Sequence, residues 1–127
     1  MTGMGARPKR SLAVLACMDA RIDLDSLLGL ERGDAHIVRN AGGLVTDDVL
    51  RSLSVSQRLL GTKEVVVVMH RDCGIEGRAD FGGFEDLEAS LRHSLERLRA
   101  APQLVAHDRI RGLIYDPADG SVEEIEG

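Results

Sequence analysis

Aromatic residues are nearly absent from this sequence of 127 residues, which has no tryptophan, one tyrosine and two phenylalanines. A surface on which nucleic-acid bases stack needs aromatic side chains, so a platform of that kind is excluded. The hydrophobic fraction of 43% is nevertheless that of a globular protein rather than a disordered one. The core must therefore be built from leucine, valine, isoleucine and alanine.

Long hydrophobic runs are also missing. The two longest, Leu12–Cys17 and Val65–Met69, fall far short of the roughly 20 residues that a membrane-spanning helix needs. The apolar stretch that follows the basic residues of the N-terminus is too short for a secretory signal. We therefore expect a cytoplasmic protein with no membrane partner.

Positive charge is scarce and scattered. Lysine and arginine number 16 against 21 aspartates and glutamates, which gives a formal net charge of −5. The basic residues stand singly among acidic and apolar ones, unlike the patches that bind nucleic acid or an anionic membrane. We therefore expect no nucleic-acid partner. At 127 residues the chain suits one hydrophobic core and is too short for two of ordinary size.

Apolar patterns alternate between strand-like and helix-like segments along the chain. They predict strands at Ser11–Cys17, Ala35–Arg39, Glu64–Met69, Arg109–Tyr115 and Ser121–Ile125. They predict helices at Asp23–Leu30, with Asp23 as its N-cap, at Asp47–Leu60, and from Phe84 to just before Pro102. This alternation predicts an α/β fold with a mainly parallel central sheet, helices on both faces and a final antiparallel hairpin. We expect one domain over residues 1–127, with residues 1–10 as a short N-terminal tail.

Side chains that can bind a metal follow two of these strands. Every second position from the end of the first strand carries such a side chain or a charged one: Cys17, Asp19 and Arg21. An extended backbone would turn all three to one side. His70 and Cys73 follow the valine-rich strand. Ligands of an open parallel sheet bind at the carboxyl ends of its strands, so we expect the two groups to converge there.

The donor set is that of a zinc site. Two sulfurs, an imidazole nitrogen and a carboxylate suit tetrahedral Zn²⁺ far better than calcium or magnesium. The chain places its whole cysteine supply, Cys17 and Cys73, in these positions. The alternative is that both cysteines are small buried residues and that His70 is a core histidine with ordinary hydrogen bonds. Donor type, spacing and strand-end position together favour a zinc-binding domain.

Three segments in this order resemble the motifs of the β-class carbonic anhydrases: Cys17-x-Asp19-x-Arg21, Arg39-Asn40-Ala41-Gly42 and His70-x-x-Cys73-Gly74. The resemblance is close over residues 11–77 and looser over the terminal strands. It implies a four-stranded parallel sheet with one added antiparallel strand, and a homodimer or a tetramer. It also implies that Cys17, His70 and Cys73 hold Zn²⁺, while Asp19 and Arg21 form the catalytic pair that governs the fourth position.

A zinc ion with three protein ligands has one open position, where it lowers the pKa of a water molecule and supplies hydroxide near neutral pH. The expected reaction is the reversible hydration of CO₂ to bicarbonate by that zinc-bound hydroxide. Arg21 can hold Asp19 as an ion pair, or release it to become a fourth ligand, and family members exist in both states. The same site could instead hydrolyse carbonyl sulfide or carbon disulfide, or Asp19 could complete a non-catalytic structural zinc site.

Four further residues are expected in the substrate pocket: Gly74, Ala41, His36 and Val55. His36 stands where plant-type members carry an aromatic residue, and it is either a proton shuttle or a simple polar substitution at a strand edge. Only ten residues precede the first strand, where family members usually carry a helical arm that embraces the partner subunit. We therefore expect the contact made by that arm to be reduced.

Overall fold

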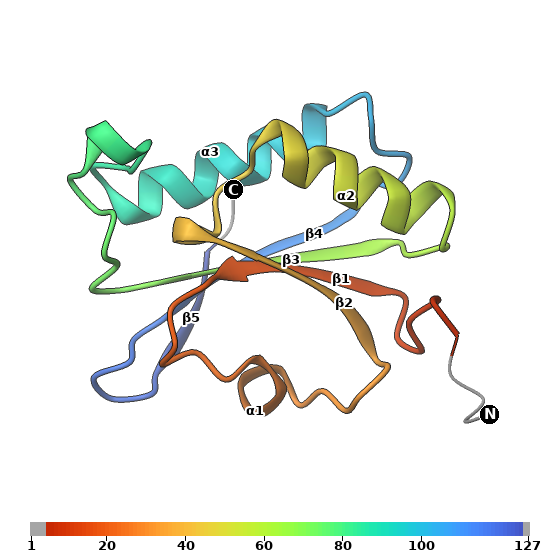
Figure 1. Ribbon diagram of the computed structural model, residues 1–127, viewed down its shortest axis with the longest axis horizontal. Coiled ribbons are helices and arrows are strands. Elements are labelled where there is room, and N and C mark those ends of the chain that lie inside the picture. Colours follow the sequence, from red (N-terminus) through yellow and green to blue (C-terminus); the bar gives the residue numbers. More distant parts are fainter. Residues whose placement is uncertain (1–4, 126–127) are drawn as a thin grey trace.

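The computed structural model describes residues 5–125, and its centre is a five-stranded sheet (Figure 1). The strands are β1 (Leu12–Cys17), β2 (Ala35–Asn40), β3 (Glu64–His70), β4 (Arg109–Tyr115) and β5 (Val122–Ile125). Their order across the sheet is β2-β1-β3-β4-β5. All pairings are parallel except that of the edge strand β5, which runs antiparallel to β4. The expected α/β fold with one antiparallel edge strand is confirmed.

The register brings the carboxyl ends of β1, β2 and β3 to one edge of the sheet. Cys17, the last residue of β1, lies opposite Asn40, the last residue of β2. Ala16 lies opposite Val68 of β3, which continues for two residues to His70. Strand β3 is thus one residue longer than the valine pattern predicts, and this added residue carries the imidazole at the edge where the site was expected.

Helices cover both faces of the sheet (Figure 1). They are α1 (Leu24–Leu28), α2 (Asp47–Arg58) and α3 (Leu87–Ala100), with α2 and α3 on one face and α1 on the other. Helix α3 packs on β3 and β4 and buries Leu91, Leu95 and Leu98 completely. Burying one leucine contributes about 1.5–3 kcal/mol, so this apolar stripe accounts for the position of the helix. None of the helices within residues 5–125 is long and apolar enough to cross a membrane.

The ends of the helices differ from expectation because of local capping. Helix α3 begins at Leu87 rather than Phe84, because the Asp86 carboxylate accepts a hydrogen bond from the Ala89 N–H at 2.9 Å. Helix α2 ends two residues earlier than expected, at Arg58. Two short 3₁₀ turns add to the expected elements: η1 (Ala41–Gly43) and η2 (Ala79–Phe81).

Helix α1 is shorter than the eight residues expected for it, and both of its ends have a clear cause. Asp23 is the predicted N-cap, and its side chain accepts a hydrogen bond from the Ser26 N–H at 3.3 Å. Gly29 ends the helix at a φ of +64°, a left-handed conformation that glycine adopts without a steric penalty. The segment between β1 and β2 therefore contains only a short helix on its face of the sheet.

Candidate metal centre

Three buried side chains meet at the carboxyl edge of the sheet. Cys17 ends β1, His70 ends β3, and Cys73 lies in the loop that follows β3. Their potential ligand atoms, two Sγ atoms and one imidazole nitrogen, all lie within 4.8 Å of one another. Asp72, whose φ of +59° lies in the left-handed region, turns the chain just before Cys73. The structure thus brings together the three side chains that the sequence predicts as zinc ligands.

The hydrogen bonds of His70 leave one ring nitrogen available to a metal. Nδ1 lies 2.8 Å from the carbonyl oxygen of Arg71, and because a carbonyl only accepts, Nδ1 carries the hydrogen. Nε2 therefore has the lone pair, and it is buried with no hydrogen-bond partner. A buried polar atom without a partner is costly unless something else binds it. Metal-binding histidines commonly have their other ring nitrogen fixed in this way, so Nε2 fits a zinc ligand.

The two cysteines also fit a site for a cation. Cys17 Sγ accepts a hydrogen bond from the Gly42 N–H at 3.3 Å. Burial raises the pKa of the Cys73 thiol, and the neighbouring Cys17 raises it further. A divalent ion reverses this effect because it stabilises both thiolates. Two sulfurs and one imidazole match tetrahedral Zn²⁺ with one position left over.

The Gly42 N–H reaches Cys17 because turn η1 packs closely against the backbones of β1 and β3. Turn η1 follows β2 directly and passes the ends of β1 and β3. At Gly43, where φ is +63°, a Cβ atom would lie 3.0 Å from backbone atoms of Ala16 and Cys17 and 3.1 Å from the Val68 carbonyl oxygen. Such contacts leave room only for glycine. The glycine pair after Asn40 therefore serves the packing of the turn against the ligand strands.

Asp19 lies beside the three ligands but is held by Arg21. The guanidinium donates from Nε to Oδ1 at 3.0 Å and from a terminal nitrogen to Oδ2 at 2.8 Å. The Arg21 backbone N–H also donates to Oδ1, at 2.8 Å. The side-chain and backbone hydrogen bonds hold the pKa of the Asp19 carboxyl well below its usual range, and the Asp19 carboxylate raises the pKa of Arg21. Oδ2 lies 3.7 Å from His70 Nε2, so an ionised carboxylate adjoins the metal position while both of its oxygens are occupied by Arg21.

Arg39 supports the same loop, a role that was not expected from its sequence position. Its guanidinium donates to the carbonyl oxygens of Cys17 at 2.8 Å, Asp19 at 2.9 Å and Ile22 at 3.3 Å. One side chain of β2 thereby fixes the backbone that carries Asp19 and Arg21. The available signal was an arginine at a strand end, next to an irregular loop whose carbonyl groups need donors.

Two of the four residues expected in the substrate pocket lie next to the ligands. Gly74 directly follows Cys73. Ala41 opens turn η1, and the next residue of that turn donates its N–H to Cys17. Gly74 is thus the sequence neighbour of a ligand, and Ala41 is the sequence neighbour of a residue that donates a hydrogen bond to a ligand.

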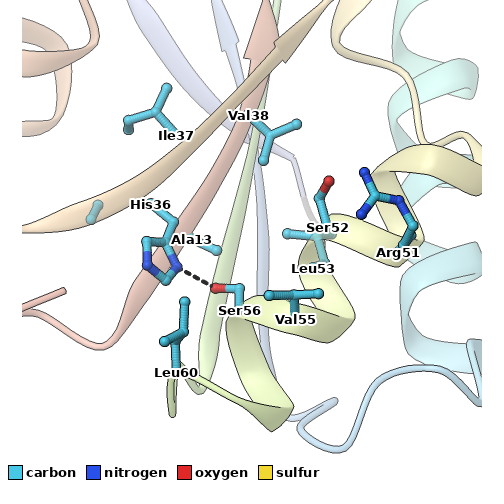
Figure 2. A pocket seen from close by; sticks show the side chains of 11 residues that line it. Ala13, His36, Ile37, Val38, Arg51, Ser52, Leu53, Val55, Ser56 and Leu60 are labelled. Atoms are coloured by element: carbon cyan, nitrogen blue, oxygen red, sulfur yellow. Dashed lines mark hydrogen bonds between the residues drawn. The ribbon is translucent and has the colours of Figure 1, made fainter. Parts of the chain in front are cut away.

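His36 and Val55 do not lie beside the ligands of the same chain. His36 pairs with Ala13, four residues before Cys17 along β1, a separation of about 13 Å. His36 and Val55 line a cavity of about 410 Å³ between β2 and α2, and none of the three ligands borders it (Figure 2). Within one chain, the expected four-residue pocket is not brought together, because strand geometry separates the two ends of β2.

His36 instead links β2 to neighbouring segments through ordinary hydrogen bonds. Nε2 lies 2.6 Å from the Ala6 carbonyl oxygen and must donate to it. Nδ1 of the neutral ring then accepts from the Ser56 hydroxyl of α2 at 2.6 Å, as Figure 2 shows. Ser56 Oγ is in turn 2.7 Å from Thr62 Oγ1. Both ring nitrogens are satisfied, which suits the interpretation of His36 as a polar substitution at the edge strand.

Known proteins resemble this chain in both sequence and structure. It is 38% identical over 136 aligned residues to β-carbonic anhydrase 1 of Mycobacterium tuberculosis, which covers 93% of this chain and 83% of that protein. The crystal structure of a carbonic anhydrase from Streptococcus mutans matches with a TM-score of 0.86 at 40% identity, covering 94% of this chain and 84% of the other. A carbon disulfide hydrolase of an Acidianus species is 52% identical over 71 residues, which cover 56% of this chain and 35% of that enzyme.

The sequence profile of one protein family, described as carbonic anhydrase, matches residues 12–109. This range starts with β1 and ends at the first residue of β4, so it contains the three ligands and both loops that carry them. The relative from Mycobacterium tuberculosis is a β-carbonic anhydrase. The chain belongs to the β-carbonic anhydrase family.

Proposed function

We propose that this protein is a zinc-dependent carbonic anhydrase that reversibly hydrates CO₂ to bicarbonate. The Asp19–Arg21 pair beside the three-ligand cluster is the observation that supports this most directly. A purely structural zinc site would take the carboxylate as its fourth ligand and would gain nothing from a guanidinium that occupies both carboxylate oxygens. The paired geometry supports a fourth position that is open to a small molecule.

Zinc held by Cys17, His70 and Cys73 would lower the pKa of a water molecule in its fourth position and so supply hydroxide near neutral pH. The chain's own residues orient the reactants. Asp19, ionised through its contact with Arg21, offers Oδ2 as a hydrogen-bond acceptor 3.7 Å from His70 Nε2. From there it could accept a hydrogen bond from a small molecule at the fourth position and so orient that molecule toward CO₂.

Stopped-flow measurement of CO₂ hydration, with the zinc content determined on the same sample, tests this function. We expect activity at one zinc per chain that increases from neutral to alkaline pH. The thiolates of Cys17 and Cys73 cancel the formal charge of Zn²⁺, so hydroxide should form at higher pH than with three neutral histidines. One zinc per chain without CO₂ hydration at either pH would contradict the proposal, and a protein that binds no zinc would contradict the site itself.

Hydrolysis of carbon disulfide is the second candidate function. The stretch that is 52% identical to the Acidianus carbon disulfide hydrolase supports it, because the identity is concentrated in about half of this chain. CO₂ and carbon disulfide are both small linear molecules with an electrophilic central carbon. Release of hydrogen sulfide from carbon disulfide by the zinc-loaded protein, in the absence of CO₂ hydration, would favour this alternative.

We also propose that the protein forms a homodimer through β2. This strand is an edge of the sheet with unpaired backbone groups, and it exposes Ile37 at 44% beside the cavity of Figure 2. His36 and Val55 line that cavity, away from the ligands of their own chain. They could therefore approach only the zinc site of the partner subunit, across such an interface. Ile37→Lys is expected to yield monomers in sedimentation equilibrium, whereas Val122→Lys on the opposite edge strand, where Val122 is 45% exposed, should not. An Ile37→Lys protein of unchanged mass would contradict this interface.

Two broader expectations remain proposals. Residues 1–127 are proposed to form a single zinc-binding domain, since the buried hydrophobic residues of the described part belong to one cluster. A cytoplasmic location is proposed because a reducing compartment keeps Cys17 and Cys73 as thiols for the metal. Limited proteolysis that releases two stable fragments would contradict the first, and recovery of the protein outside the cytoplasm after cell fractionation would contradict the second.

A further inference from the structure

Arg21 makes a second set of contacts that its pairing with Asp19 does not require. One terminal nitrogen of the guanidinium donates to the Asp72 carboxylate at 3.2 Å, and the other donates to the Asp72 carbonyl oxygen at 3.0 Å. The edge formed by Nε and one terminal nitrogen binds Asp19, and the edge formed by the two terminal nitrogens binds Asp72. The planar guanidinium thus joins two acidic residues in a fixed geometry.

The two acidic residues lie in loops that follow different strands of the sheet. Asp19 is two residues from Arg21 in the loop after β1, so these two side chains can move together as a unit. Asp72 lies in the loop after β3, between the ligands His70 and Cys73. The contact with Asp72 therefore ties the guanidinium to the segment at the end of β3 that carries two of the three ligands.

The backbone of Asp72 is part of the same arrangement. Its φ of +59° lies in a region that residues other than glycine seldom occupy, and Ser11 is the only other such residue within residues 5–125. In this conformation both the carboxylate and the carbonyl oxygen of Asp72 accept hydrogen bonds from Arg21. Backbone conformations of this kind persist where the surrounding contacts hold them, and they are common at functional sites.

We propose that Asp72 is a positioning residue, which holds Arg21 against Asp19 and thereby keeps Asp19 from becoming the fourth zinc ligand. This inference rests on the proposed function. The Asp72 side chain is 87% exposed and that of Arg21 is 46% exposed. Exposed ion pairs shift an equilibrium by at most about fivefold, so the expected effect is modest but measurable.

The test measures azide binding to the protein loaded with Co²⁺ in place of zinc, because the visible spectrum of Co²⁺ changes with its fourth ligand. Asp72→Asn and Asp72→Gly both accept the left-handed backbone. Asparagine removes the charge and keeps an oxygen for Arg21, whereas glycine removes the side chain. We expect the azide dissociation constant to rise about twofold to fivefold in Asp72→Asn, and at least as much in Asp72→Gly, because a freed Asp19 competes with azide for the metal.

The direction of the change separates positioning from a general effect of charge. Loss of a negative charge near an anion site would by itself tighten azide binding, which is the opposite of the expected result. The matched control is Asp80→Asn, which removes the same charge from the exposed Arg78–Asp80 pair, 2.8 Å apart, and should leave azide binding unchanged.

Unchanged or tighter azide binding in both Asp72 variants would overturn the proposal. So would an unaltered protein that binds no azide, because Asp19 would then already occupy the metal. The measurement needs no CO₂. An unaltered protein that binds azide but does not hydrate CO₂ would therefore overturn the proposed function and leave the role of Asp72 standing.

Discussion

Replacing Cys73 with serine is expected to remove zinc from the protein and to abolish CO₂ hydration. Serine keeps the size of the side chain but replaces a thiolate by a hydroxyl that stays protonated and binds zinc poorly. Loss of a residue that merely orients a ligand costs roughly 10- to 100-fold in metal affinity, so loss of a ligand itself should cost more than about 100-fold. Zinc content by mass spectrometry and a competition titration with a chromophoric chelator would measure the loss.

A matched pair of histidine variants controls for the general effect of substitution. His70→Gln removes the nitrogen that faces the two sulfurs, whereas His93→Gln changes an exposed histidine on α3. We expect zinc loss and inactivity in the first and normal zinc content and activity in the second. Full zinc occupancy in both Cys73→Ser and His70→Gln would show that the metal binds elsewhere.

Replacing Arg21 with alanine is expected to reduce CO₂ hydration by about 10- to 100-fold while leaving the zinc content unchanged. The reason is that Asp19 loses the two hydrogen bonds from the guanidinium and keeps only the one from the backbone N–H of residue 21, so that its carboxylate becomes free to take the fourth position on the metal. Arg21 is 46% exposed, so the fold should be little affected. Stopped-flow kinetics, zinc analysis and urea unfolding on one preparation would test all three statements.

The control for Arg21→Ala is Arg78→Ala. Arg78 also pairs with an aspartate two residues away, at 2.8 Å, but in the loop that contains η2. We expect normal CO₂ hydration in this control. CO₂ hydration that is unchanged in Arg21→Ala would refute the assigned role of the Asp19–Arg21 pair, whatever the control shows.

Acidification should reduce the stability difference between Arg21→Ala and the unaltered protein. In the folded state the contact with Arg21 holds the pKa of Asp19 below its usual value. A carboxyl group of this kind contributes stability above its unfolded pKa of about 4, and the contribution declines as the pH falls toward the lower folded value. Urea unfolding at neutral pH and at acidic pH would therefore give a larger difference at neutral pH.

Capping explains why the type of each main element was predictable while its ends were not. The apolar stripe of α3 predicts a helix, but the side-chain hydrogen bond of Asp86 places its start three residues after Phe84. Hydrophobic periodicity reports which face of an element is buried and is insensitive to one turn more or less. The same holds for α2, which ends at Arg58.

The contacts of Arg21 with Asp72 and of Arg39 with Cys17 could not be predicted because each joins residues far apart in the sequence. Arg21 and Asp72 are separated by 51 positions, and Arg39 and Cys17 by 22. Both arginines stand in or beside recognisable motifs, yet a long flexible cation has many possible partners. The strand order and register select the partner, and no local pattern encodes them.

The position of His36 differs from that of the ligands within one chain. The resemblance to plant-type members suggests a place in the substrate pocket, but a strand rises about 3.3 Å per residue. His36 therefore lies at the level of Ala13, beside the cavity shown in Figure 2. Closeness in sequence along an extended segment does not bring a side chain to the end of that segment.

The sheet and its alternation of strands and helices followed from the sequence, and so did the expectation that Cys17, His70 and Cys73 hold zinc. These depend on local patterns, since buried strands are short apolar runs and ligands of parallel sheets follow strand ends. The three-dimensional structure was needed to find which oxygens Arg21 binds, that Asp72 and Arg39 contact the neighbouring loops, and that His36 lines a separate cavity. Those outcomes depend on the distance and direction between side chains of separate strands, which exist only once the register of the sheet is formed.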